Sequence, residues 1–454
     1  MQSKMKTACL MAGALLAAVP GVTHAETTEL EQMRAEMAQM RAEMAQLKAD
    51  SQADWASDAR RAEIEGMIAD VFADANNRAT LLQEGALAGI DEKGKIFLLS
   101  ADGSFSANFN GQIQARYIFN TIDGRTGSPS QESISGFQMR RVKFGVKGSV
   151  GDGWGYNIVF ATERDTGSGG GNTFTEDAYI TYKINDNWSM AAGVKKLPFA
   201  RQELISSKRQ VGVDRSLVTE FFTLNRGEQV AFNYSDGGDI KASVALSDGA
   251  NNDFVDYNAA GNANDFAVTG RVDWQAIGDN WKAAKHEFGG TDEDALFVGA
   301  AAHYEVTDGS GTPDSGLAWT VDALYKTGSI GLTAAVFGNS TDNVGTDTDQ
   351  LGIYVQGSLD LGNDWDVFAR WETIDDDFAG SEDLEAVTFG VNKHFNANVK
   401  FTGDIVWIYA GDNQSADGNI INGGELSDGL GLTTSGFSDA EDQIALRLQL
   451  QLIF

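Results

Sequence analysis

The segment Ile444-Ala-Leu-Arg-Leu-Gln-Leu-Gln-Leu-Ile-Phe454 decides the fold, because its side chains alternate in character. Apolar residues occupy every even position from Ile444 to Phe454, and Arg447, Gln449 and Gln451 stand between them. A β-strand points successive side chains to opposite faces, so this segment has one apolar and one mostly polar face. Such a strand, with an aromatic residue at its end, is typical of the closing strand of a bacterial outer-membrane β-barrel.

The composition of the 454-residue chain agrees with a large barrel plus an appendage. No run of about 18 or more apolar residues follows residue 25, which excludes a helical membrane span. Glycine is abundant (52 residues) and proline scarce (4 residues), as paired strands require, since proline lacks the backbone N–H. The formal charge of −31 argues against a nucleic-acid partner, because a phosphate backbone would be repelled.

Residues 1–25 have the organisation of a secretory signal peptide. Lys4 and Lys6 precede an apolar stretch, and small residues precede a cleavage site expected after Ala25. The only cysteine, Cys9, lies in this segment. We therefore expect a mature chain without disulfides.

Residues 26–90 are expected to form a periplasmic helical segment and a linker. Between residues 29 and 49, apolar side chains recur at alternating spacings of three and four, flanked by Arg and Glu, which is the pattern of a short coiled coil. We favour a coil within an oligomer, most plausibly a trimer. A single amphipathic helix on the protein's own surface is the alternative. Gly85 and Gly89 suit a linker.

From about residue 100 to residue 454 the hydrophobic period is two, and the pattern predicts an all-β, sixteen-stranded antiparallel transmembrane barrel. The expected strands lie near 105–119, 141–150, 154–163, 175–184, 187–197, 228–236, 238–247, 265–275, 294–306, 317–327, 329–338, 350–360, 364–373, 385–394, 398–409 and 441–454.

Tight turns such as 151–153 and 362–363 alternate with long connections such as 121–136, 198–227 and 410–440. Short turns at one rim and long loops at the other are the outer-membrane arrangement. Residues 276–293 are the exception, because they are long where a short turn is expected, and we interpret them as a periplasmic insert. Aromatic residues near strand ends indicate girdles at the two lipid–water boundaries: Trp154, Trp188, Trp274, Trp365, Trp371 and Trp407, with Tyr117, Tyr156 and Tyr409.

A sixteen-stranded barrel encloses a lumen too wide for wall side chains to fill, so an aqueous channel with a narrowing element is expected. The connection 198–227 is the candidate, because it is net positive in a strongly negative chain and contains apolar pairs that would hold it against the wall. These pairs are Leu204-Ile205, Leu217-Val218 and Phe221-Phe222.

A ring of Arg and Lys at a constriction selects anions by replacing part of their hydration shell. By strand parity the inner face also carries Arg271, Lys241, Lys326, Arg370, Lys400 and Arg447, together with the acids Glu163, Asp177, Asp273, Glu305, Asp322, Asp360, Asp366, Glu372 and Asp404. The residues alone leave both anion preference and no preference open. Our candidate pore-lining and anion-binding residues are Arg140, Arg141, Lys143, Lys147, Lys195, Arg201, Lys208, Arg209, Arg215 and Arg226.

Acids concentrate in the expected external loops, with seven in 411–442 and six in 373–385. They either keep the loops solvated or bind divalent cations that bridge to lipopolysaccharide. The sequence offers no metal-site spacing, cofactor motif or catalytic motif, so we expect no cofactor and no enzyme activity. A barrel hydrolase would need a His–Ser pair on the outer wall, whereas His303 and His394 face inward by parity.

Three stretches resemble the phosphate-selective porin family. Gly136-Phe-Gln-Met-Arg-Arg-Val-Lys-Phe-Gly-Val-Lys-Gly148 is similar to its arginine-pair strand, and Asp177-Ala-Tyr-Ile180 to the strand that follows. Residues 193–207, with Asp214-Arg-Ser216, are similar to its strand-to-constriction-loop region. The resemblance covers about residues 100–454 and implies a homotrimer of sixteen-stranded barrels with an inward third loop and an arginine ladder. By motif, it singles out Arg140, Arg141, Lys195, Arg201 and Arg215 as basic pore-lining residues.

The sequence thus predicts a passive porin of the Gram-negative outer membrane, in contact with lipid and lipopolysaccharide. Small anions, with phosphate among the candidates, are the expected solutes. One alternative is a general or cation-preferring porin whose selectivity is set by its acidic rim. Another is an envelope-tethering barrel in which conduction is incidental.

Overall fold

The computed structural model describes residues 87–91, 95–122, 133–162, 173–250, 266–291, 293–307, 314–342, 347–375, 377, 383–410 and 443–454. The expected signal peptide and the heptad segment 29–49 lie outside these residues. No helix among the described residues is long and apolar enough to cross a membrane.

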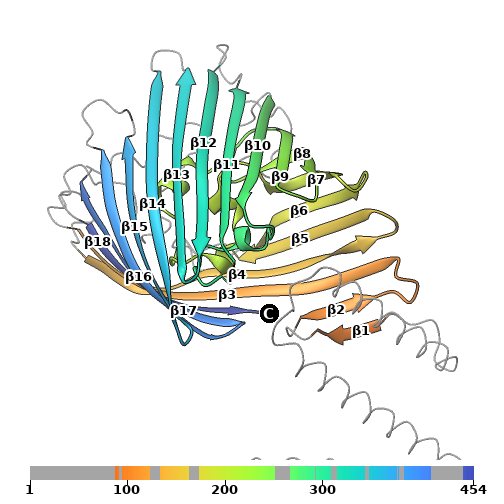
Figure 1. Ribbon diagram of the computed structural model, residues 1–454, viewed down its shortest axis with the longest axis horizontal. Helices are drawn as coiled ribbons and strands as arrows, with labels where there is room; N and C mark the ends of the chain where they lie inside the picture. Colours follow the sequence, from red (N-terminus) through yellow and green to blue (C-terminus); the bar gives the residue numbers. More distant parts are fainter. Residues whose placement is uncertain are drawn as a thin grey trace, which may run out of the picture. The chain divides into compact units, whose positions relative to one another are not determined.

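Sixteen antiparallel strands form a closed barrel, as the sequence predicts (Figure 1). Strand β18 pairs with β3, for example Leu448 with Tyr117, and this pairing closes the ring. The strands are β3 Phe105–Ile122, β4 Ser133–Val150, β5 Trp154–Thr162, β6 Thr173–Lys183, β7 Trp188–Lys196, β8 Arg226–Ser235, β9 Ile240–Ser247, β10 Phe266–Ile277, β11 Ala295–Thr307, β12 Asp314–Thr327, β13 Ile330–Asp342, β14 Thr348–Gly362, β15 Trp365–Asp375, β16 Leu384–Asn396, β17 Val399–Ala410 and β18 Gln443–Ile453.

Alternation along the strands separates an outer apolar face from an inner polar one. In β18, Ile444, Leu448 and Leu450 are exposed on the outside, whereas Arg447 and Gln449 are buried inside. The exposed side chains would contact lipid in a membrane, and the buried polar ones line or fill the lumen. The alternation read from the C-terminal segment is therefore confirmed.

The two rims differ in the length of their connections. At the short-turn rim, Gly151–Gly153, 184–187, 236–239, 328–329, 363–364 and 397–398 join neighbouring strands. The connections of the opposite, long-loop rim include 123–132, 197–225 and 411–442. The first of them is shorter than the expected loop 121–136, because β4 begins at Ser133.

Indole rings are exposed on the outer face near both rims. Trp154 and Trp188 begin β5 and β7 at the short-turn rim, and Trp274 and Trp365 lie at the same level. Trp371 and Trp407 lie toward the long-loop rim, where the indole N–H of Trp371 donates to the Tyr409 hydroxyl (3.1 Å). These two levels agree with aromatic girdles.

A short hairpin precedes the barrel and was not predicted. Strands β1 (Leu87–Ile90) and β2 (Ile96–Leu99) pair with each other, and β2 pairs with β3 at residues 106–108. This part of β3 lies beyond its pairing with β18, which ends at Gln112. Four-residue strands are too short for a two-residue period to be recognised in the sequence.

Candidate pore constriction

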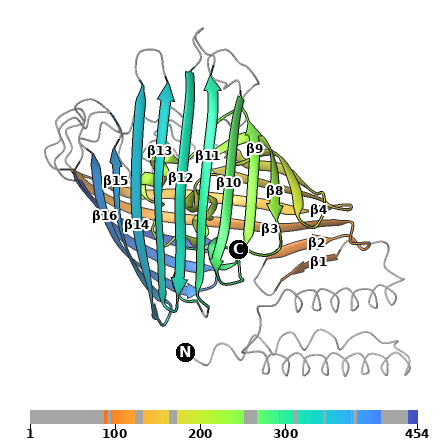
Figure 2. The same ribbon diagram turned by 45° about the horizontal axis from the view of Figure 1, so that its top comes forward.

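The connection between β7 and β8 lies inside the ring of strands (Figure 2). It contains three short helical turns: α3 (Arg201–Leu204), η1 (Ser207–Arg209) and α4 (Leu217–Phe222). The Ser216 hydroxyl accepts a hydrogen bond from the backbone N–H of Thr219 and so caps α4. We call residues 197–225 the constriction loop.

Apolar side chains hold the constriction loop against the inner wall. The rings of Phe222 and Phe337 (β13) stack with centroids 5.6 Å apart, and Phe199 packs against Phe337 at 6.2 Å. Phe222 and Val218 also cover Gly352 of β14 so closely that a Cβ there would lie 2.4 Å and 2.8 Å from them. The predicted apolar anchors are therefore in place, except that Leu204 is exposed.

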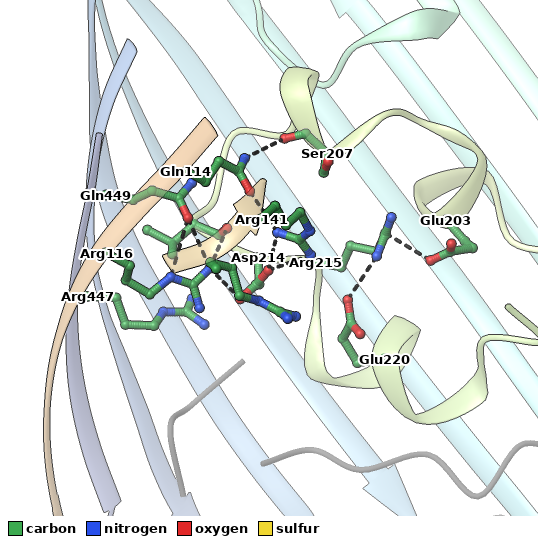
Figure 3. Close-up of polar contacts among 12 residues, drawn as sticks. Gln114, Arg116, Arg141, Glu203, Ser207, Asp214, Arg215, Glu220, Arg447 and Gln449 are labelled. Carbon is green, nitrogen blue, oxygen red and sulfur yellow. Dashed lines mark hydrogen bonds and ion pairs between the residues drawn. The ribbon is translucent and has the colours of Figure 1, made fainter. Parts of the chain in front are cut away.

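The carboxylate of Asp214 fastens the loop to the opposite wall, where three guanidinium groups converge on it (Figure 3). Arg116 of β3 lies 2.7 Å from it, Arg141 of β4 3.1 Å and Arg140 3.6 Å. Burial acts to raise the pKa of Asp214, but these arginines outweigh it and hold that pKa well below its ordinary value. Three guanidinium groups around one carboxylate give these four side chains a summed charge of +2.

A β-bulge explains how neighbouring Arg140 and Arg141 reach the same carboxylate. Opposite β4, Gln114 pairs with Arg141 and Ala115 with Met139, so Arg140 is the extra residue of a bulge. A bulge inserts one unpaired residue and re-aims its side chain. The bulge therefore explains how Arg140, whose strand parity would point it outward, reaches Asp214 in the lumen.

A second bulge brings an unpredicted acid into the lumen. Val159 pairs with Asp177 and Phe160 with Thr175, so Glu176 is the unpaired residue of β6. Its carboxylate forms ion pairs with Lys143 and with Arg226 (3.3 Å). Arg226 also donates to Asp177 (2.7 Å). Lys143 and Arg226 are thus largely neutralised.

Arg215 of the constriction loop is paired as well. Arg215 contacts Glu203 at 3.0 Å and Glu220 at 3.2 Å. Burial would raise the pKa of Glu203, but Arg215 and Lys196 outweigh it and lower that pKa to about 2. These contacts lie within the loop or join it to β7, so they stabilise its shape.

Arg201 joins the loop to the wall. It contacts Asp322 of β12 at 2.6 Å and Asp273 of β10 at 2.8 Å. Arg271 contacts the same two carboxylates, and the four side chains form a balanced group. Arg201 is therefore a docking contact of the loop.

Lys195, Lys208 and Arg209 have no such acidic partner among the described residues. Lys195 lies over the ring of Tyr179 (5.6 Å), and Lys208 donates to the side chain of Asn110 (3.4 Å). Lys208 is half-buried and Arg209 is exposed. Burial, followed by the positive charges of Lys95 and Lys147, lowers the pKa of Lys208. Basic side chains from the loop, β4 and the hairpin therefore gather at one place.

Arg116, Glu176 and Glu287 are constriction residues that were not among the predicted site residues. Arg116 lies on the polar face of β3, so strand parity could have found it. Glu176 was hidden by its bulge. Glu287 lies in the connection between β10 and β11, and the only unusual feature of this connection in the sequence was its length.

His303 on the inner wall contacts a hydrogen-bonding side chain at each of its two ring nitrogens. His303 Nδ1 is 2.8 Å from the Thr269 hydroxyl and Nε2 is 2.9 Å from Glu305. Thr269 and His303 are fully buried, so this hydroxyl is not accessible to a substrate. Within the described part of the chain, no group of three His, Cys, Asp or Glu residues is arranged to hold a metal ion.

Several solved structures of outer-membrane channels have a similar architecture. A structure of an anion-selective porin from Comamonas acidovorans is similar, with a TM-score of 0.55 and 14% identity over 77% of this chain and 100% of that one. For the outer membrane channel DcaP of Acinetobacter baumannii, the TM-score is 0.52 and the identity 13%, over 77% of this chain and 98% of that one. For OprB of Pseudomonas putida, the TM-score is 0.50 and the identity 10%, over 77% of this chain and 94% of that one. At these identities the likeness concerns the fold.

The sequence comparisons identify the family. No curated protein matches the chain. The profile of phosphate-selective porin O and P matches residues 108–426, which is well over half of the sequence. Together with the closed sixteen-stranded barrel, this match indicates a channel rather than an enzyme. The chain belongs to the phosphate-selective porin O and P family and is a channel of the Gram-negative outer membrane.

Proposed function

We propose that this porin passes small solutes by passive diffusion with a preference for anions, and that phosphate is the first solute to test. One observation carries the preference. The acids of the constriction loop, Glu203, Asp214 and Glu220, are all engaged in ion pairs, whereas Lys208 and Arg209 form none with a described residue. The accessible charge of the loop is therefore positive.

An exposed cation in a narrow, low-dielectric passage raises the local anion concentration and can replace part of an anion's hydration shell. Lys208 and Arg209 stand near Lys95 and Lys147, so their potentials add. The paired arginines contribute less, because a neighbouring carboxylate cancels much of each charge. Among the ten candidates, we assign the attraction of anions to Lys208, Arg209 and Lys195. We assign a docking role to Arg201 and Arg215.

Phosphate competition tests this assignment. Phosphate added to a chloride solution should reduce the chloride current of the native channel. The double substitution Lys208→Gln/Arg209→Gln should raise the phosphate concentration needed for half reduction. Lys183→Gln is the matched control, because Lys183 is an exposed lysine at the short-turn rim. Equal phosphate sensitivity in all three proteins would contradict the proposal.

We infer a homotrimer whose outer faces contact lipid and lipopolysaccharide and whose N-terminal segment lies in the periplasm. The exposed apolar faces and the two levels of indole rings support a lipid contact. The heptads at 29–49 and the family resemblance support the trimer. Light scattering of the detergent-solubilised protein tests the trimer, and a mass of one protomer would contradict it.

A further inference from the structure

The connection between β10 and β11 enters the lumen from the short-turn rim. Its residues 278–291, here called the inner segment, include the turn η2 (Ala283–Lys285). The Trp281 indole donates to the carbonyl of Gly238 in the β8–β9 turn (2.7 Å), and the Thr291 N–H donates to Gly328 O in the β12–β13 turn (2.8 Å). The segment is thus fastened to the rim at both ends.

Between these ends the inner segment packs against the wall. Trp281 lies 5.3 Å from the ring of Phe297, and Ala283 and Ala284 pack on the same buried group. Further along, Phe288 meets His394 of β16 edge-on at 5.1 Å, and the ammonium group of Lys400 (β17) lies 4.8 Å above its ring. These contacts extend from β11 to β17, so the segment covers this arc of the inner wall.

Glu287 joins the inner segment to the constriction loop. Its two carboxylate oxygens accept separate hydrogen bonds, one from the side-chain amide of Gln202 (2.6 Å) and one from the backbone N–H of Val211 (3.0 Å). Its backbone N–H donates to Arg209 O (3.3 Å), and its carbonyl accepts from the Ser358 hydroxyl (3.1 Å). Glu287 is almost fully buried.

We propose that the inner segment is a second constriction element and that Glu287 is the residue that positions the constriction loop. The constriction loop enters from the long-loop rim and the inner segment from the short-turn rim. Elements from both ends of the barrel therefore meet at the constriction. This inference rests on the channel function. It does not depend on anion preference.

The two donors require a carboxylate at position 287. A glutamine would offer one acceptor oxygen and one N–H₂ donor. Its N–H₂ group would then face the N–H of either Gln202 or Val211, and that hydrogen bond would be lost. Gln202 cannot turn its amide to compensate, because its Oε1 already accepts from the Ser216 N–H (2.9 Å). Glu287→Gln should therefore loosen the loop with little change in volume, since a lost hydrogen bond to a buried charged group is costly.

The test combines ion currents with thiol labelling. Val211 is fully buried under Glu287, and the only cysteine of the chain is Cys9. In protein without residues 1–25, Val211→Cys should react slowly with a water-soluble thiol reagent. Adding Glu287→Gln should raise the labelling rate by about tenfold, the factor expected for one lost charged hydrogen bond. The single-channel current of Glu287→Gln should fluctuate between levels.

Glu293→Gln is the matched control, because Glu293 is an exposed acid just beyond the inner segment. It should leave labelling and current unchanged. Heat-modified gel mobility establishes that each variant holds a folded barrel. A folded Glu287→Gln protein with native labelling and a steady native current would overturn the proposal. That outcome would leave the proposed anion preference standing, because ion preference is tested separately by the reversal potential.

Discussion

Asp214 of the constriction loop and Arg116 of β3 form a 2.7 Å ion pair, and both side chains are almost completely buried. Arg140 and Arg141 converge on the same carboxylate from β4. A buried carboxylate that loses its charge leaves its partners unneutralised, and breaking such a contact typically costs about 3–5 kcal/mol. Asp214 is therefore one of the residues that fix the position of the loop and hence the width of the lumen.

Asp214→Asn should release the loop from the β3–β4 wall while the barrel stays folded. We expect a larger and noisier single-channel conductance. Asp186→Asn is the control, because Asp186 forms an exposed ion pair with Lys183 at a short turn and contacts no part of the loop. A native conductance in Asp214→Asn would contradict this role of Asp214.

Gly352→Ala tests those apolar contacts. The added methyl group would meet the ring of Phe222 at 2.4 Å and Val218 at 2.8 Å, so α4 must move away from β14. Overpacking of this kind costs about 1–3 kcal/mol. Because the displaced helix moves toward the lumen, conductance should decrease without loss of the folded barrel. Gly357→Ala, on the same strand with an ordinary 3.5 Å contact to Leu332, should behave as the native protein.

Gly111→Val tests barrel closure. Gly111 and Phe454 exchange backbone hydrogen bonds of 2.8 and 3.3 Å, and a Cβ at Gly111 would lie 2.1 Å from the Phe454 ring. The larger side chain should displace the end of the closing segment from β3. We expect a lower temperature for the loss of the folded form on gels. Gly136→Val on β4, where open space surrounds the added Cβ, should have a smaller effect.

The pH dependence of the inner segment should follow His286. Burial, and then the charges of Lys326 and Arg209, lower its pKa from 6.5 to about 4. The folded arrangement opposes protonation of this base, so its stability is fully present above pH 6.5 and is lost as the pH falls toward 4. Current fluctuations should therefore increase over this range.

His286→Asn keeps an acceptor near Lys326 but cannot be protonated, and it should abolish the increase. Glu203 contributes little to the change over most of this window. Its contribution is fully present above about pH 4.5 and is lost as the pH falls from there toward its lowered pKa of about 2. A current that is equally steady at pH 7 and pH 4 in the native protein would contradict the assignment to His286.

The wall of the barrel could be predicted from the sequence because alternation is a local property. In β18 the side chains of Ile444 and Leu450 need only be apolar to be placed outside, whatever their neighbours. The two bulges could not be predicted. Inserting Arg140 or Glu176 shifts the parity by one residue, and a single-residue shift leaves no compositional trace.

The constriction was predictable only in outline. The charge and the apolar pairs of 198–227 indicated an inward loop, but ion pairing decides which of its cations remain accessible. The partners of Arg201 and Arg226 lie on distant strands or in a bulge. The unusual length of 276–293 was visible in the sequence. Its course into the lumen follows from the long-range contacts of Trp281 and Glu287.

The reversal potential of single native channels in a planar bilayer, measured under a potassium chloride gradient, tests the central claim most directly. Positive charge left accessible in the constriction predicts a sign that corresponds to chloride as the more permeant ion. High salt should weaken the preference, since it screens exposed charges within about 3–10 Å. A sign that corresponds to potassium as the more permeant ion would contradict the account.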